Sequence, residues 1–259
     1  MKWNTKKIIQ IAFGLVVVAI IGNVLLYMFN LSPFNLAVID QSRSVSAANV
    51  TDIHVNSNTA NVNIVPYDGT EIQVHMKGKS EERWADDFQL SVEENGNQVT
   101  IEANELEKTR IFVLYSGDYE LLVQLPQKNF ERLQVQTEAA DIDVEGVQIK
   151  RSFLEAGVGN ITSKQLQGII NGVTGAGDIY VQLQSVENDI EAKTSVGNIT
   201  VTTEIAPEAI QTELRNGLGE RTIDFPGLPN AEDGSVGTGG PNVKLSAEVG
   251  DLALLMADH

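Results

Sequence analysis

The strongest constraint in the sequence is a short phrase that recurs between residues 137 and 203. A small residue precedes Asp or Asn, and Ile follows, at Ala140-Asp141-Ile142, Gly159-Asn160-Ile161, Gly177-Asp178-Ile179 and Gly197-Asn198-Ile199. The polar residues stand at positions 141, 160, 178 and 198, so the steps are 19, 18 and 20 residues. This period is too short for a repeating pair of helices and fits one coil of a β-solenoid.

Local backbone chemistry explains these residue types. Gly takes a positive φ without steric cost, and Asn and Asp tolerate the left-handed region, so the two together make a tight corner. The Ile opens a strand such as Ile142-Asp143-Val144, whose alternation is typical of a half-buried strand. A second strand, such as residues 189–194, completes the period, because two strands at about 3.3 Å per residue and two corners fit this length.

Looser copies of the phrase stand outside the regular run, at Ala60-Asn61-Val62 and Gly250-Asp251-Leu252. The predicted structural turn residues are therefore Asn61, Asp141, Asn160, Asp178, Asn198 and Asp251. The fold class expected from these repeats is all-β, with a parallel β-solenoid of the β-helix type. Turns between antiparallel strands also recur at short spacing, so a β-sandwich is the alternative.

The chain on either side of the repeats is also rich in predicted strands. Before them, runs such as residues 71–76 and 119–125 alternate, and most of these runs end at Gly, Pro or Asn. After Thr203 several prolines and the glycine-rich stretch 234–240 predict longer loops. Because a solenoid needs its end covered, we expect this later segment to act as a cap.

The beginning of the chain predicts a membrane anchor. Residues 8–29 contain no charged side chain, and 22 residues at about 1.5 Å each span the roughly 30 Å hydrocarbon core. Lys2, Lys6 and Lys7 precede this span, which predicts a cytoplasmic N-terminus and an extracellular C-terminal domain. A cleaved signal peptide is the alternative, but its candidate cleavage site, Val45-Ser46-Ala47, lies far beyond the apolar segment.

These features predict a single-pass protein of the cell membrane. The stretch after the apolar span is rich in Ser, Asn and Ala and lacks periodicity, which predicts a flexible linker. The expected organisation is a cytoplasmic N-terminus at 1–7, a transmembrane signal-anchor helix at 8–29, a linker at 30–49 and a β-strand repeat domain at 50–256. The membrane is thus the first expected partner.

Composition and motifs exclude several classes of function. The absence of Cys excludes thiol catalysis, thiolate metal sites and disulfides. Beyond residue 30, 15 basic residues stand against 35 acidic ones, a formal charge of −20, so no nucleic-acid partner is expected. HExxH, GxSxG and phosphate-binding loops are missing, so we expect no catalytic residues, no cofactor and no metal. His54 and His75 alternate with apolar positions and are expected to face solvent.

Calcium is the alternative at the predicted corners, because Asp141, Asp178 and Asp251 could line a cation site between coils. The calcium-binding nonapeptide, however, needs GGxGxD with Asp and carbonyl groups converging between coils. Here Asp alternates with the neutral Asn160 and Asn198. An amide at alternate corners suits a ladder of hydrogen-bonded turns, so structural turns are preferred to a calcium site.

The order of these features resembles a known family. An apolar anchor is followed by a strand-rich segment that ends in Val123-Gln124-Leu125-Pro126, and Leu133-Gln134-Val135 then leads into the repeated Gly-Asp/Asn-Ile turns. This arrangement is similar to the putative adhesin family of bacterial β-strand repeat domains of unknown function. It is most similar to short members with one anchor that are linked to the cell-envelope stress operon of Gram-positive bacteria. The similarity covers roughly residues 50–256 and implies a fold without agreed catalytic residues.

The function expected from these observations is that of a non-enzymatic, membrane-anchored extracytoplasmic protein. We expect it to act in the cell-envelope stress response by contact with other envelope proteins or wall components. The alternatives are a surface adhesin and a glycan-active enzyme built on a β-helix scaffold. Several carboxylates that converge in one groove would favour the enzyme, whereas carboxylates scattered over the corners would favour the interaction protein.

The predicted topology can be tested with single cysteines placed at Thr5 and at Asp233. On intact cells an impermeant thiol reagent should label only the Asp233→Cys variant, because the basic residues before the span hold the N-terminus inside. Labelling of the Thr5→Cys variant alone would reverse the orientation. A mature protein that starts near residue 48 would show a cleaved signal peptide instead of an anchor.

Overall fold

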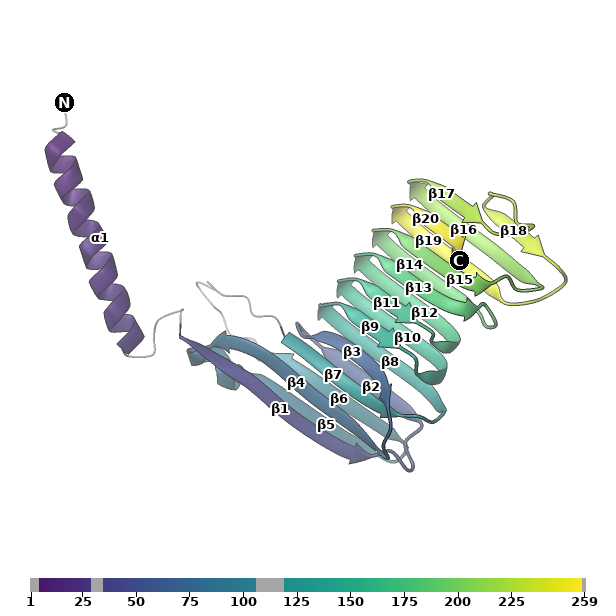
Figure 1. The fold of residues 1–259 in the computed structure, drawn as a ribbon, viewed down its shortest axis with the longest axis horizontal. Helices are drawn as coiled ribbons and strands as arrows, with labels where there is room; N and C mark the ends of the chain where they lie inside the picture. Colours follow the sequence, from purple (N-terminus) through teal and green to yellow (C-terminus); the bar gives the residue numbers. More distant parts are fainter. Residues whose placement is uncertain (1–4, 29–34, 106–118, 258–259) are drawn as a thin grey trace.

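The described residues of the computed structural model are 5–28, 35–105 and 119–257. They form the helix α1 (Thr5–Met28), the short 3-10 helix η1 (Glu82–Asp87) and two large β-sheets (Figure 1). The expectation of a mostly β chain with one N-terminal apolar helix is confirmed.

The helix α1 is long and apolar enough to cross a membrane over Lys6–Met28. Its 24 residues correspond to about 36 Å at 1.5 Å per residue, which exceeds the thickness of a hydrocarbon core. None of the most apolar part of this helix is buried against the rest of the described chain. Residues 1–4 of the predicted cytoplasmic segment and Phe29 of the predicted span lie outside the described residues.

All the described strands belong to two sheets, which we call sheet A and sheet B. In spatial order, sheet A contains β1 (Leu36–Ser46), β4 (Glu71–Glu81), β7 (Tyr119–Pro126), β3 (Asn61–Tyr67), β9 (Ile142–Glu145), β11 (Ile161–Lys164), β13 (Ile179–Ser185), β15 (Ile199–Ile205), β20 (Leu252–Met256) and β17 (Arg221–Asp224). Sheet B contains β18 (Asp233–Val236), β16 (Ile210–Leu218), β19 (Asn242–Val249), β14 (Ile190–Val196), β12 (Gln167–Ala176), β10 (Gln148–Val158), β8 (Phe130–Ala139), β2 (Asp52–Ser57), β6 (Gln98–Glu105) and β5 (Phe88–Asn95). Both sheets are mixed, because parallel middle strands are joined by antiparallel strands near the ends.

Each repeat places one strand in sheet B and the next strand in sheet A, and we call such a pair a level. The strand β10, for example, leads through a corner into β11 of the same level. Successive levels pair in parallel and in register, so that Ile161 lies between Ile142 and Ile179 (Figure 1). This pairing is the one expected for stacked coils and differs from the antiparallel strands of a sandwich.

The hydrophobic core lies between the two sheets and consists of columns of buried side chains. One column is formed, level by level, by Val62, Ile142, Ile161, Ile179, Ile199 and Leu252. Alternation within each strand produces these columns, because every second side chain points to the same face and parallel pairing sets equal positions side by side. Burial of one such β-branched or Leu side chain stabilises the fold by roughly 1.5–3 kcal/mol.

At both ends of the stack the order of levels in space differs from their order in the sequence. The first level, β2–β3, lies between β6–β7 and β8–β9, so the terminal level is the second one in the chain. At the other end β19–β20, which comes last, lies between β14–β15 and β16–β17. The segment after Thr203, predicted to act as a cap, thus supplies a terminal level and the antiparallel strand β18.

Residues 36–46 do not form a linker, contrary to the prediction for residues 30–49. They form β1, which runs antiparallel to β4 from the pair Leu36 and Glu81 to the pair Ser46 and Glu71. The sequence gave no periodic signal here because β1 is an edge strand in which only Ile39 is fully buried. Backbone hydrogen bonds to β4, rather than an apolar face, hold such a strand.

A glutamine closes the space between the two sheets at this end. The side chain of Gln41 on β1 donates to the carbonyl oxygen of Phe88 at 2.9 Å and accepts from the N–H of Leu90 at 3.1 Å. Both partners belong to β5, the edge strand of sheet B. The amide therefore provides the donor and the acceptor that a further strand would supply to β5.

The stacked core column makes a stability prediction. The substitution Ile161→Asp should lower the free energy of unfolding by about 3–5 kcal/mol, because it places an unpaired charge in a fully buried column. Thr200→Asp, on the outer face of β15, should cost less than about 1 kcal/mol. Denaturant unfolding of the fragment 31–259 measures both changes. Equal and small effects would contradict the column.

Candidate functional site

The predicted turn residues lie together along one edge of the stack, where sheet B turns into sheet A. There the backbone N–H of each corner residue donates to the side-chain Oδ1 of the corner residue one level before. The pairs, with their N to Oδ1 distances, are Asp141 to Asn61 (3.0 Å), Asn160 to Asp141 (2.7 Å), Asp178 to Asn160 (2.9 Å), Asn198 to Asp178 (2.7 Å), Asp251 to Asn198 (2.8 Å) and Glu220 to Asp251 (2.7 Å). We call this chain of bonds the corner ladder.

The corner ladder satisfies backbone groups that the sheets leave open. At a corner the N–H no longer points along the sheet, and an unpaired N–H costs free energy comparable to a lost hydrogen bond. The carbonyl of each corner residue is used as well, since the N–H of Ile161 donates to the oxygen of Asp178 at 2.9 Å. Each corner is therefore bonded in both directions along the stack.

Amide and carboxylate alternate strictly along the first six positions of this ladder. Asp251 follows Asn198 in space although 53 residues separate them in the chain. Two carboxylates such as Asp141 and Asp178 are thus two levels apart, about 9.6 Å at the usual strand spacing, which is close to the Debye length in physiological salt. The alternation keeps an acceptor at every corner without placing carboxylates side by side, except where Glu220 ends the ladder.

Small residues allow the levels to approach closely at this edge. Gly177 has a φ of 153°, and a Cβ there would lie 2.1 Å from the carbonyl oxygen of Gly159. Buried hydroxyl groups bond the corner carbonyls from inside, as Thr174 does with Gly159 at 2.8 Å and Thr194 with Gly177 at 3.1 Å. These contacts make the corner a rigid structural feature.

A row of exposed apolar side chains runs beside the ladder, at the last position of the sheet B strands. In spatial order the row contains Val158, Ala176, Val196, Val249 and Leu218. Leu218 is 70% exposed and Val158 is 59% exposed, although the parallel pairing brings the members of the row together. A contiguous apolar row of this kind is typical of a contact surface rather than of a monomer's random surface.

The opposite edge of the stack, where sheet A turns back into sheet B, holds a hollow of about 670 Å³. The corners at residues 146–147 and 165–166 are short, whereas the corner at residues 186–189 is longer. The short corners therefore form the floor of the hollow, and the longer corner stands beside them as a wall. We call this hollow the amide groove.

Amide side chains dominate the lining of this groove. They come from successive corners and are those of Asn129, Gln148, Gln165, Gln167, Gln184 and Asn188. All are exposed to solvent. The apolar lining residues Ile149 and Leu166 belong to the buried core and show little surface in the groove.

The charged groups of the amide groove are few. Glu187 and Glu204 contribute carboxylates from neighbouring levels, and Lys150 is the basic member of the lining. The Lys150 ammonium is paired with Glu131, with 2.5 Å between Nζ and Oε1. The groove therefore presents neutral hydrogen-bonding groups with a slightly acidic border.

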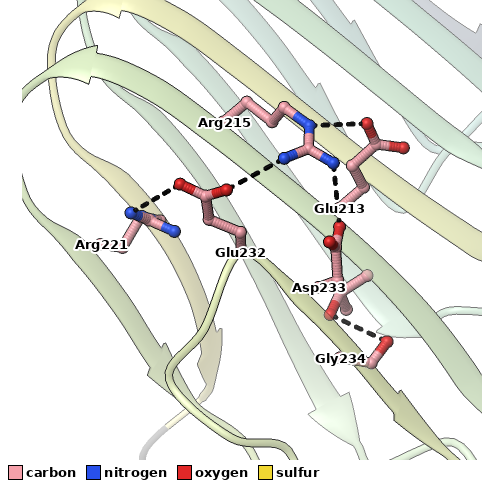
Figure 2. A network of polar contacts seen from close by, with 7 residues as sticks. Glu213, Arg215, Arg221, Glu232, Asp233 and Gly234 are labelled. Carbon is pink, nitrogen blue, oxygen red and sulfur yellow. Dashed lines mark hydrogen bonds and ion pairs between the residues drawn. The ribbon is translucent and has the colours of Figure 1, made fainter.

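Other polar clusters serve the architecture. Arg215 on β16 bonds Glu213 at 2.9 Å, Glu232 at 3.0 Å and Asp233 at 3.2 Å, and Glu232 also bonds Arg221 of β17 at 3.3 Å (Figure 2). The hydrogen bond to Glu213, followed by the charge of Asp233, raises the pKa of Arg215. The network joins β16, β17 and β18, and it holds the terminal level together.

A lysine performs a similar task at the other end of the stack. The Nζ atom of Lys128 donates to the carbonyl oxygens of Ala47 and Val50, and it lies 4.9 Å from the centre of the Phe130 ring. Burial lowers the pKa of Lys128. Its contacts fasten the turn between β1 and β2 to the start of β8.

The predicted histidines lie on outer faces of the sheets and are partly exposed. His75 pairs with Asp40 of β1 at 2.6 Å, and His54 lies 3.3 Å from the side chain of Gln98. Within residues 5–28, 35–105 and 119–257, no three His, Asp or Glu side chains form a group that could hold a metal ion. The carboxylates of the predicted calcium alternative are spread along the corner ladder, where they accept backbone hydrogen bonds.

The sequence analysis missed the amide groove. A signal was present, since Gln165-Leu166-Gln167 and Gln182-Leu183-Gln184 place glutamines around the second corner of consecutive repeats. A Gln-x-Gln pattern alone is also typical of any exposed face of a strand. Only the short corners beside a longer one turn these glutamines into the lining of a hollow.

The stacked levels, the corner ladder and the mixed sheets define a β-strand repeat protein. Residues 50–176 match the family Toastrack DUF4097, so the chain contains a Toastrack domain and belongs to this β-repeat family of unknown function. The match ends where β12 ends, yet the same parallel pairing continues through β20. The predicted resemblance to the adhesin-like β-repeat family is confirmed.

Comparison with solved structures supports the same fold. A "putative cell adhesion protein" from Clostridium sporogenes is similar over 85% of this chain and 100% of its own, with 14% identity and a TM-score of 0.54. A "putative adhesin" from Bacteroides fragilis covers 83% of this chain and 97% of its own, with 15% identity and a TM-score of 0.39. A "putative lipid binding protein" from Parabacteroides distasonis covers 85% and 97%, with 14% identity and a TM-score of 0.32. Among curated proteins none matches this chain.

The corner ladder makes a prediction about charge. Asp141→Asn should leave stability nearly unchanged, because the new amide oxygen can accept the same bond from Asn160. Asn160→Asp should lower the free energy of unfolding by about 1–2 kcal/mol at pH 7 in low salt, since it places three carboxylates in succession. The loss should shrink at high salt and again at pH 3, where protonation removes the repulsion.

Thermal unfolding of the fragment 31–259 at two salt concentrations and two pH values measures this difference. A third variant, Asn160→Ala, removes the acceptor without adding charge, and its loss of stability should not depend on salt. If Asp141→Asn proved as harmful as Asn160→Asp, the alternation of charge would not matter for this edge.

Proposed function

We propose that the chain is a non-enzymatic protein whose helix α1 anchors a β-solenoid ectodomain at the outer face of the cell membrane. The observation that carries this proposal is the combination of an apolar helix with a β body that begins only a few residues later. The helix Lys6–Met28 is long and apolar enough to span a bilayer. Sheet A begins with β1 at Leu36.

The short connection limits where the ectodomain can work. Residues 29–35 separate α1 from β1 and span at most about 25 Å when fully extended. The stack of levels is therefore held close to the lipid surface, where wall precursors and envelope stress systems operate. A body held this close does not cross a thick wall to grip another cell, so an envelope-stress role is preferred to adhesion.

The surface of the ectodomain supports action by contact. The exposed apolar row at the corner ladder and the amide groove at the opposite edge offer two surfaces of different chemistry. A formal charge of −20 beyond residue 30 opposes binding to nucleic acid. The partners of this proposal are the membrane, other envelope proteins and wall components.

The alternative of a glycan-active enzyme receives less support. Glycoside hydrolysis needs a pair of carboxylates on either side of the scissile bond, with the acid partner held at a raised pKa. The acidic residues of the described ranges follow the corners and outer faces instead of gathering in a groove. The similar solved structures are described as adhesion or lipid binding proteins, not as enzymes.

Deletion of the gene tests the proposed role. The deletion strain should show altered survival, or an altered envelope-stress reporter response, under antibiotics that act on the wall, while its attachment to surfaces stays unchanged. Complementation with the full chain should restore the response, whereas complementation with residues 31–259 alone should not, because that form lacks the anchor. Loss of attachment with a normal antibiotic response would favour the adhesin.

A further inference from the structure

We infer that the amide groove binds a neutral, hydroxyl-rich sugar chain that lies across several levels of the stack. This inference rests on the proposed function, because it names the class of wall component that the ectodomain contacts. The groove has about 670 Å³ of space, which is in the usual range for small-molecule and saccharide sites.

The lining amides are available to a ligand. The side chains of Gln148, Gln165, Gln167 and Gln184 make no hydrogen bond to any other residue within the described part of the chain. Each amide offers two N–H donors and a carbonyl acceptor. Sugar hydroxyl groups, which donate and accept, can pair with both ends of such an amide.

The electrostatics of the groove argue against an anion. The carboxylates of Glu187 and Glu204 border it, and the ammonium of Lys150 is already paired with Glu131. A phosphate or an acidic polysaccharide would meet repulsion from the border and from the acidic ectodomain without a free cation to offset it. A neutral ligand avoids this cost.

The backbone of the groove argues against a peptide. Peptides in grooves usually add a strand to an open sheet edge or place side chains into apolar pockets. Here the corner backbone is already paired, since the N–H of Gly146 donates to Lys164 at 2.9 Å and that of Gln165 to Gln182 at 2.7 Å. The apolar floor residues are buried in the core.

The repetition of the groove suits a polymer. Gln148 and Gln167 occupy paired positions of β10 and β12, so their Cα atoms are separated by one strand spacing of about 4.8 Å. A chain of similar units can therefore meet similar amides on successive levels. Polymer length should raise the affinity, because each added sugar reaches a further level.

Local backbone irregularity is concentrated in this groove. Gln165 has a φ of 50° and is the one residue other than glycine with positive φ in the described ranges. The pairing of β10 with β12 shifts register between Gln148 and Arg151, which indicates a bulge. Bulges and strained residues are enriched at binding sites, because they re-aim side chains.

The test uses the full chain in lipid nanodiscs and ligand-observed NMR. The probes are the hexamer of N-acetylglucosamine, a glucose hexamer and, as the anionic sugar, an oligomer of galacturonate. Because the lining has no aromatic ring for stacking, we expect a dissociation constant of about 1 mM for a neutral hexamer. Binding of both neutral sugars supports recognition of hydroxyl groups, and binding of the N-acetylated sugar alone adds recognition of the acetamido group.

Variants connect the binding to the groove. Gln165→Gly suits the positive φ and removes the amide, and Gln184→Ala removes a second amide from an exposed position. The double variant should weaken binding at least fivefold while its melting temperature stays near that of the unchanged chain. Gln211→Ala, an exposed glutamine on β16 outside the groove, is the matched control and should bind normally.

Three results would overturn the inference: no neutral hexamer binds up to about 10 mM, galacturonate binds better than both, or the double variant binds as tightly as the control. The deletion experiment tests the proposed envelope role separately. If the sugars do not bind but deletion still changes survival under wall-active antibiotics, only the assignment of the groove fails.

Discussion

The structure depends on one interaction at each corner of the stack, the bond from a backbone N–H to the side-chain oxygen one level below. Strands pair through their backbone for most of their length, but a corner breaks this pairing and leaves donors open. Asp or Asn supplies the missing acceptor, and the bond of 2.7 Å from Asn160 to Asp141 is typical of the series. Because every level both accepts and donates, the ladder fixes the register of the two sheets that meet at the corner.

Register in turn determines the core. A shift by one residue would turn a column such as Val62, Ile142 and Ile161 toward solvent, since side chains alternate along a strand. The same register sets carboxylates of the ladder two levels apart instead of one. Packing and electrostatics therefore favour the same pairing, which is the consistency expected of a sequence that specifies a single fold.

The two edges of the stack carry different constraints. At the corner ladder, a Cβ in place of Gly177 would collide with the carbonyl of Gly159, so the sequence there has little freedom. At the opposite edge the corners differ in length and present exposed amides, and no comparable contact restricts them. A rigid edge beside a variable one is a common arrangement for function, because a fixed scaffold positions adaptable binding residues.

The ends of the stack show how the protein protects open strand edges. The terminal levels are not the ends of the chain, and antiparallel strands β4, β1, β5 and β18 continue the sheets beyond them. Gln41 bonds the edge strand β5, and the Arg215 network ties β18 to its neighbours. Such covering lowers the tendency of exposed strand edges to pair with other chains.

The sequence by itself determined what depends on neighbouring residues: the apolar helix, the period of the repeats, the corner residue types and the alternation of each strand. Tertiary structure alone decided which levels lie side by side. Asp251 continues the alternation after Asn198 only because β19–β20 inserts inside the terminal level, and residues 36–46 become a strand only because β4 offers a partner. The amide groove likewise depends on corners of unequal length meeting in space. The physical reason is that pairing between distant strands uses backbone groups, which are the same at every residue and leave no local signal in the sequence.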